Sequence, residues 1–148
     1  MAVALLGGVA SACELVLTEH RSGRELARLP LAANSPSAQV AFTHSVLGTP
    51  VLDRYVWRSD GGAWRAHLVE ERFEGEGYGL PNAAGPGETL TRHGKGWRLQ
   101  LDRLVHPLVV RPLPSQGTRL IIDQRPPLLL GSLSDAAIEM RAENCKKK

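Results

Sequence analysis

Short runs of alternating apolar and polar residues fill most of this chain, and turn residues separate them at nearly regular intervals. Successive side chains of a β-strand point to opposite faces, so a period of two predicts strands rather than helices. The 15 glycines and 10 prolines among 148 residues supply the turns. About ten short strands without helical crossovers predict an all-β fold with little helix, either an antiparallel β-sandwich or an open β-barrel.

The alternating runs also predict where each strand lies. We expect strands over residues 14–18, 25–29, 39–45, 51–59, 63–73, 88–92, 97–101, 108–113, 119–123, 128–133 and 136–142. Only 136–142 competes as a helix, because Ser134 could cap it, but its own period of two favours a strand. The expected core consists of Leu15, Leu17, Leu29, Val40, Phe42, Val56, Leu68, Leu99, Leu101, Val109, Leu120 and Ile122.

The charge of the chain does not indicate a nucleic-acid partner. Its net charge is +3, but the terminal lysines 146–148 account for the whole excess and leave 15 basic residues against 15 acidic ones. No basic stripe is interleaved with aromatic residues, as nucleic-acid binding would require. We interpret 146–148 as a solvated lysine tail.

The N-terminus predicts export. Residues 1–12 are apolar and uncharged and end in Ala10-Ser11-Ala12, which resembles a signal-peptidase site, although the usual positive charge is missing. We expect residues 1–12 to be an export or anchor segment and residues 13–145 to form one all-β domain. The protein would then be periplasmic, or membrane-anchored and facing the periplasm. The alternative is that residues 3–12 form a first strand or an ordered arm of a cytosolic protein.

Only two cysteines are present, Cys13 and Cys145. Cys13 follows Ala12 as the lipidated cysteine follows a bacterial lipobox, so it is a candidate lipidation site. In an oxidising compartment the two cysteines could instead form a disulfide, and in a reducing one they would stay free thiols. Without a C-x-x-C pair or a Cys/His cluster we expect no metal and no cofactor.

Polar residues gather where the run 39–45 ends and the run 51–59 begins. In a regular strand His44 shares a face with Val40 and Phe42, while Ser45 points away, which argues against a serine nucleophile paired with His44. Asp53 falls on the same face as Tyr55, so this carboxylate requires a partner, and His44 could supply one across the hairpin.

A second group of candidates follows some thirty residues later. Within 63–73, Glu70 and Glu71 point to opposite faces, so one of them must lie beside apolar neighbours and be paired, or mark a ligand or cation site. The loop Gly77-Tyr78-Gly79 allows positive φ and a close backbone approach. We interpret it as a rigid loop, or as a cradle of backbone amides for a small anion.

These elements together resemble a known family. The resemblance is carried by Leu29-Pro30-Leu31, Phe42-Thr43-His44-Ser45, Thr49-Pro50-Val51 and a Glu-x-x-Phe before Gly77-Tyr78-Gly79-Leu80-Pro81. In this order and spacing they are similar to the bacterial domain-of-unknown-function family 1850, over roughly residues 14–133. Asp53 stands where the family pattern leads us to expect glutamate. The resemblance implies a small exported or anchored protein, often encoded beside tripartite ATP-independent periplasmic (TRAP, TAXI-type) transporters.

Three functional classes follow. The first is a non-enzymatic accessory or binding module whose partners are a transporter permease or solute-binding protein, with a small anion or a cation as ligand. The second is a hydrolase-like enzyme that uses His44 with Asp53 or Glu71 as acid and base. The third is a purely structural interaction domain of the cell envelope.

Overall fold

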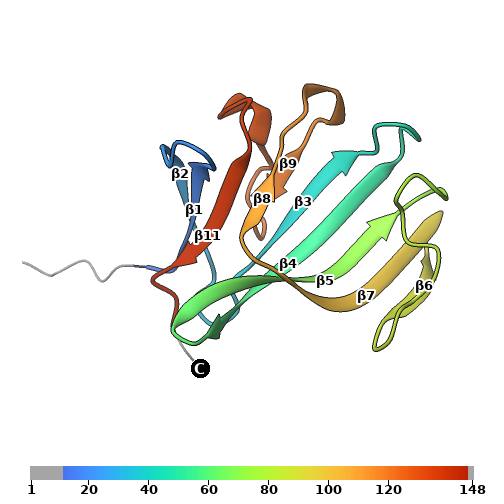
Figure 1. Ribbon diagram of the computed structural model, residues 1–148, viewed down its shortest axis with the longest axis horizontal. Helices are drawn as coiled ribbons and strands as arrows, with labels where there is room; N and C mark the ends of the chain where they lie inside the picture. The colour runs from blue at the N-terminus through green and yellow to red at the C-terminus, as the bar shows by residue number, and fades with distance from the viewer. Residues whose placement is uncertain (1–11, 147–148) are drawn as a thin grey trace, which may run out of the picture.

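A computed structural model of the protein describes residues 12–146, which form two antiparallel sheets packed as an open sandwich (Figure 1). The sheets are not closed into a barrel, so the sandwich alternative of the sequence prediction is confirmed. The strands are β1 (Glu14–Glu19), β2 (Glu25–Pro30), β3 (Ser37–Thr43), β4 (Pro50–Asp60), β5 (Ala63–Phe73), β6 (Thr89–His93), β7 (Gly96–Val105), β8 (Leu108–Val110), β9 (Arg119–Ile121), β10 (Leu128–Leu129) and β11 (Ile138–Glu143). Two short 3-10 turns, Pro114–Gln116 and Leu130–Ser132, are the only helical segments within 12–146.

The chain moves between the sheets in a way that sequence order does not reveal. The small sheet has the order β2-β1-β11-β8, and the large sheet has the order β10-β9-β3-β4-β5-β7-β6. Consecutive hairpins build β3, β4 and β5, whereas β11 returns from the far end of the chain to lie beside β1. In Figure 1 the strands β6 and β7 lie on the opposite side of the molecule from β1 and β2.

The core lies between the two sheets and follows from strand alternation. Leu15 and Leu17 of β1 and Ile138 and Met140 of β11 are fully buried from the small sheet. The large sheet contributes, among others, Val40, Leu68, Leu99, Leu101 and Leu120. Most of the predicted core residues are therefore buried, and Leu29 and Phe42 pack against the core from partly buried positions.

The structure decides the 136–142 alternative in favour of a strand. β11 pairs with β1 along its whole length and with β8 on its other edge. It is therefore an interior strand, where backbone pairing on both sides outweighs the helix propensity of individual residues.

Two expected core positions are wrong. Val109 was expected inside, but Leu108 and Val110 lie opposite Met140 and Ile138, so they share the inner face and Val109 faces away. Val56 also faces away, because the buried Tyr55 and Trp57 occupy the inner positions on either side of it.

Four expected strands end earlier than predicted, among them 108–113 and 119–123, which end at Val110 and Ile121. β3 stops at Thr43, so His44 and Ser45 lie in the following turn rather than in a strand. The expected strand 128–133 is divided into the two-residue β10 and a 3-10 turn. No helix within 12–146 is long and apolar enough to cross a membrane. The expected export segment, apart from Ala12, and the last two lysines of the tail lie outside the described residues.

Candidate functional site

Two carboxylates lie side by side on the inner face of the large sheet. Asp53 of β4 is directly opposite Glu71 of β5. The same line across the sheet, here called the inner row, continues through apolar residues on both sides: Leu120, Val40, Asp53, Glu71, Leu99 and Leu90. Because opposed residues in antiparallel strands have Cβ atoms about 4.5–5.5 Å apart, the two acids are immediate neighbours between apolar side chains.

This placement makes the two carboxyls hard to ionise. Burial raises the pKa of Asp53 to about 7, and the neighbouring charge of Glu71 adds to that rise. Burial also raises the pKa of Glu71. The positive charge of Arg103 lowers this pKa in part, and the negative charge of Glu88 raises it further. The pKa of Tyr55 is raised as well, by burial and then by the two acids. Asp53 therefore gains or loses its proton at near-neutral pH rather than in the acid range.

A bulge in β5 decides which glutamate faces inward. Tyr55 pairs with Leu68 and Arg54 with Glu70, so Val69 is an extra residue without an opposite partner on β4. The bulge lets Leu68 and Glu71 share the inner face, although simple alternation places them on opposite faces. Glu70 consequently faces outward.

Glu70 is satisfied by arginines rather than by a ligand. Only 8% of the residue is exposed, and its Oε1 lies 3.1 Å from Nε of Arg72 and 3.4 Å from Nε of Arg98. Since a buried carboxylate is costly without such partners, we assign Glu70 a structural role. The expected need for a partner is met at Glu70 by these ion pairs. Glu71 makes no ion pair with a described residue, and the positive charge of Arg103 only partly offsets the effect of its burial.

His44 is separated from the acids and holds two loops together. Its Nδ1 accepts hydrogen bonds from the backbone N–H groups of Val46 and Leu47, both at 3.2 Å, so its Nε2 donates to the carbonyl oxygen of Tyr78 at 3.1 Å. Val40 is the residue opposite Asp53, and His44 is four residues beyond it, roughly 13 Å at the rise of a strand. The structure does not bring His44 together with the acids, and Ser45 is exposed in the turn.

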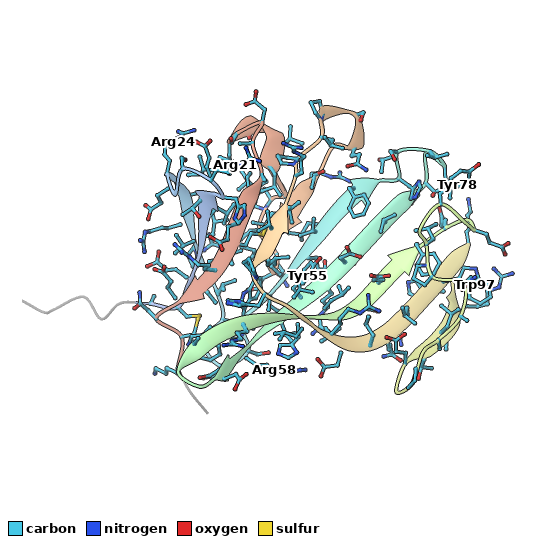
Figure 2. The ribbon with its side chains drawn as sticks, viewed as in Figure 1. Arg21, Arg24, Tyr55, Arg58, Tyr78 and Trp97 are labelled. Carbon is cyan, nitrogen blue, oxygen red and sulfur yellow. A yellow bond between two sulfur atoms is a disulfide. The ribbon has the colours of Figure 1, made fainter. Side chains whose placement is uncertain are left out.

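The glycine-rich loop displays an aromatic side chain. Gly77, Tyr78 and Gly79 all have positive φ, which is uncommon for tyrosine. The N–H of Leu80 bonds back to the carbonyl of Gly77, which closes the turn. Tyr78 is 68% exposed and lies at the end of the large sheet, away from Tyr55 (Figure 2).

Comparison with known protein families assigns the chain to one of them. A family model described as domain of unknown function (DUF1850) matches residues 38–128. The chain belongs to this family. No curated protein and no solved structure matches the chain.

The DUF1850 match runs from the second residue of β3 to the first residue of β10, and therefore covers nearly all of the large sheet. Asp53, Glu71, His44 and the loop at Tyr78 all lie within it. Strands β1, β2 and β11 of the small sheet and both cysteines lie outside it. The inner row is thus a feature of the DUF1850 region itself.

A disulfide outside the DUF1850 match joins the two ends of the folded domain. Cys13 and Cys145 are bonded to each other across 132 residues of sequence, which was one of the alternatives left open by the sequence. The sulfur of Cys13 is used in this bond and is not available for a lipid thioether. The disulfide therefore argues against lipidation at Cys13.

Sequence reasoning missed two charged residues near the inner row. Arg103 of β7 lies opposite Leu68, and its Nη2 is 3.5 Å from Oε2 of Glu88, which precedes β6. The position of Arg103 beside the inner row depends on the register shift between β5 and β7 at Leu68 and Glu70. No local sequence pattern indicates that shift. Within residues 12–146 no three His, Cys, Asp or Glu side chains are grouped so that they could hold a metal ion.

Proposed function

We propose that this protein is an exported, non-enzymatic accessory module that works beside a TRAP-type (TAXI) solute transporter. The observation that carries the proposal is the Cys13–Cys145 disulfide. Disulfides form and persist in oxidising compartments such as the bacterial periplasm and are rare in the cytosol. A bond between the two ends of the domain therefore supports an extracytoplasmic site of action.

The N-terminal sequence supports the same location. Cys13 comes directly after Ala10-Ser11-Ala12, so cleavage there would leave the cysteine at the start of the folded domain. The partner in this proposal comes from the family resemblance, which implies a neighbouring transporter permease and solute-binding protein.

The geometry of the polar residues supports binding rather than catalysis. Both ring nitrogens of His44 are engaged by backbone groups, and the acids lie roughly 13 Å away along the sheet. A general base must be within hydrogen-bond reach of the group from which it takes a proton. His44 is therefore better suited to fixing the loops at Val46 and Tyr78 for a partner.

Fractionation of the native bacterium tests the proposal. The full-length chain should appear in the periplasmic or membrane fraction, and thiol alkylation under denaturing conditions should modify neither cysteine unless a reductant is added. Cross-linking in cells should recover the transporter's permease or solute-binding protein. A protein confined to the cytosol with two free thiols would overturn the proposal.

A Cys13→Ser variant separates lipidation from other anchoring in the same experiment. Because the sulfur of Cys13 is bonded to Cys145, we expect the variant to keep its location while losing the disulfide. Release of the variant from the membrane fraction would instead establish a lipid anchor at Cys13.

A second candidate function is acid–base catalysis by the inner row without His44. It is favoured by one observation, the carboxyl of Asp53 with a pKa of about 7 beside that of Glu71, since such a group can both accept and donate a proton at neutral pH. Chromogenic esters, amides, phosphate esters and glycosides would test it. Turnover that disappears in Asp53→Asn and Glu71→Gln variants would establish an enzyme.

A further inference from the structure

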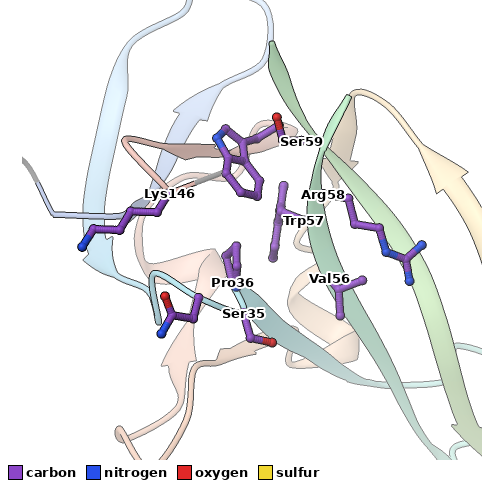
Figure 3. A pocket seen from close by; sticks show the side chains of 9 residues that line it. Ser35, Pro36, Val56, Trp57, Arg58, Ser59 and Lys146 are labelled. Atoms are coloured by element: carbon purple, nitrogen blue, oxygen red, sulfur yellow. The ribbon is translucent and has the colours of Figure 1, made fainter. Parts of the chain in front are cut away.

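A cavity of about 480 Å³ lies at the other end of β4 from the glycine-rich loop (Figure 3). It is formed by the end of β4, by Trp64 near the start of β5, by the loop before β3 and by the C-terminal segment. Its lining residues are Asn34, Ser35, Pro36, Val56, Trp57, Arg58, Ser59, Trp64 and Lys146. Pockets that bind small molecules have volumes of about 300–1,000 Å³, so this cavity is large enough for one.

One wall of the cavity is aromatic and fixed. Trp57 is only 3% exposed and belongs to the core, and its backbone N–H bonds to the carbonyl of Pro36 at 2.9 Å. Trp64 is partly buried and packs against the core from the neighbouring strand β5. Because Trp57 and Pro36 are buried, the partly exposed indole of Trp64 supplies most of the apolar surface that a flat ligand body would cover, with a gain of roughly 25 cal/mol for each Å² removed from water.

The rest of the lining supplies hydrogen-bonding groups and positive charge. Asn34, Ser35 and Ser59 have an amide and two hydroxyls, and the lining contains no carboxylate among the described residues. The guanidinium of Arg58 points away from Trp57 in Figure 3 and is 2.6 Å from the carboxylate of Asp102, so only its stem contributes.

Lys146 is therefore the cation left to act at this cavity. It lies on the side opposite Arg58 in Figure 3, and its ammonium points outward from Trp57. Its side chain is exposed and makes no ion pair with a described residue, so rotation about its side-chain bonds can bring the ammonium over the cavity. A ligand that carries a negative charge would favour that rotamer.

We propose that this cavity binds a small organic anion, with its flat apolar body against Trp64 and its anionic group toward Lys146. Aromatic carboxylates and aromatic phosphate monoesters both combine such a body with an anionic group. The inference goes beyond the proposed function, because it depends neither on where the protein works nor on a transporter partner. It also names a site separate from the inner row.

Tryptophan fluorescence of the full chain can test the site, since the protein has three tryptophans and two of them line it. The third, Trp97, borders two other cavities and is removed by Trp97→Phe. In that background, benzoate and phenyl phosphate should each change the emission with saturation, and the stronger of the two identifies the anionic group. Benzyl alcohol and acetate, which lack the charge and the apolar body respectively, should bind more weakly.

Three variants assign the binding to the cavity. Lys146→Gln should weaken benzoate binding by roughly threefold to tenfold and leave benzyl alcohol unchanged, as expected for the loss of one exposed charge interaction. Lys95→Gln, an exposed lysine away from this cavity, is the matched control and should change neither. Ser59→Phe should fill the opening and abolish both responses, with circular dichroism showing that the fold is kept.

The results can also overturn the proposal. Equal affinity for benzoate and benzyl alcohol, or no effect of Lys146→Gln, would exclude an anion-selective site. The absence of any saturable response to the four probes at millimolar concentration would exclude a ligand site of this chemistry. Neither result would affect the fractionation and cross-linking experiments that test the proposed function.

Discussion

The role of His44 follows from the backbone groups that its side chain contacts. Its ring joins the turn after β3 to the loop at Tyr78 through three hydrogen bonds to backbone groups. We expect His44→Ala to lower the free energy of unfolding by about 1–2 kcal/mol, because the two N–H groups and the carbonyl lose their protein partner. Denaturant titration measures this loss. His20→Ala removes an exposed imidazole and should cost far less, and equal effects would contradict the structural role of His44.

Asp53 makes stability depend on pH in a defined direction. The folded protein raises the pKa of this carboxyl from 3.8 to about 7, so between these values the folded state holds a proton that the unfolded state has lost. Stability therefore falls as pH rises from about 4 to about 7 and stays lower above that range. We expect Asp53→Asn to flatten this dependence and to be more stable than the wild type at pH 8, by roughly 2 kcal/mol.

Denaturant unfolding at pH 5 and pH 8 checks this expectation. Asp135→Asn changes an exposed aspartate and is the matched control, which should leave the pH dependence of stability as it is in the wild type. An Asp53→Asn variant that loses as much stability as the wild type between pH 5 and pH 8 would show that Asp53 is not the group responsible. Glu71 would then be the next residue to test, since burial raises its pKa in the same direction.

At the scale of the element, the β6–β7 hairpin depends on a close approach at its turn. Gly96 is buried, and a Cβ atom at this position would overlap the backbone carbonyl of Phe73 at the end of β5. We expect Gly96→Ala to destabilise the protein by about 2–3 kcal/mol, because the backbone must shift to relieve the overlap. Gly131→Ala is the matched control, since a Cβ there meets nothing. Similar midpoints for the two variants in thermal unfolding would contradict the close approach.

The strands themselves were largely predictable, and their partners were not. Alternation within residues 51–59 placed Asp53 on one face with Tyr55, as the structure has it. The same rule failed in β5, because the bulge at Val69 changes the face of every residue beyond it. A bulge is set by pairing with both neighbouring strands, so the choice between Glu70 and Glu71 could not be made from one strand alone.

For the whole molecule, the disulfide closes the domain at its two ends. Cys13 precedes β1 and Cys145 follows β11, two strands that already pair with each other. We expect reduction to lower the free energy of unfolding by about 2–5 kcal/mol, mainly because the unfolded chain regains the freedom of a very long loop. Urea titration with and without reductant measures this, and a Cys13→Ser/Cys145→Ser variant should not respond to reductant. Equal stability of the oxidised and reduced wild type would contradict a stabilising role.

The sequence by itself determined the all-β class, the positions of most strands and the shared face of Asp53 and Tyr55, because a period of two is a local property of the strand backbone. Tertiary structure alone decided the pairing of β1 with β11, the bond between Cys13 and Cys145, the position of Glu71 opposite Asp53 and the separation of His44 from both acids. These depend on register and bulges, which are fixed by hydrogen bonds between segments far apart in the chain. Local alternation carries no information about such partners.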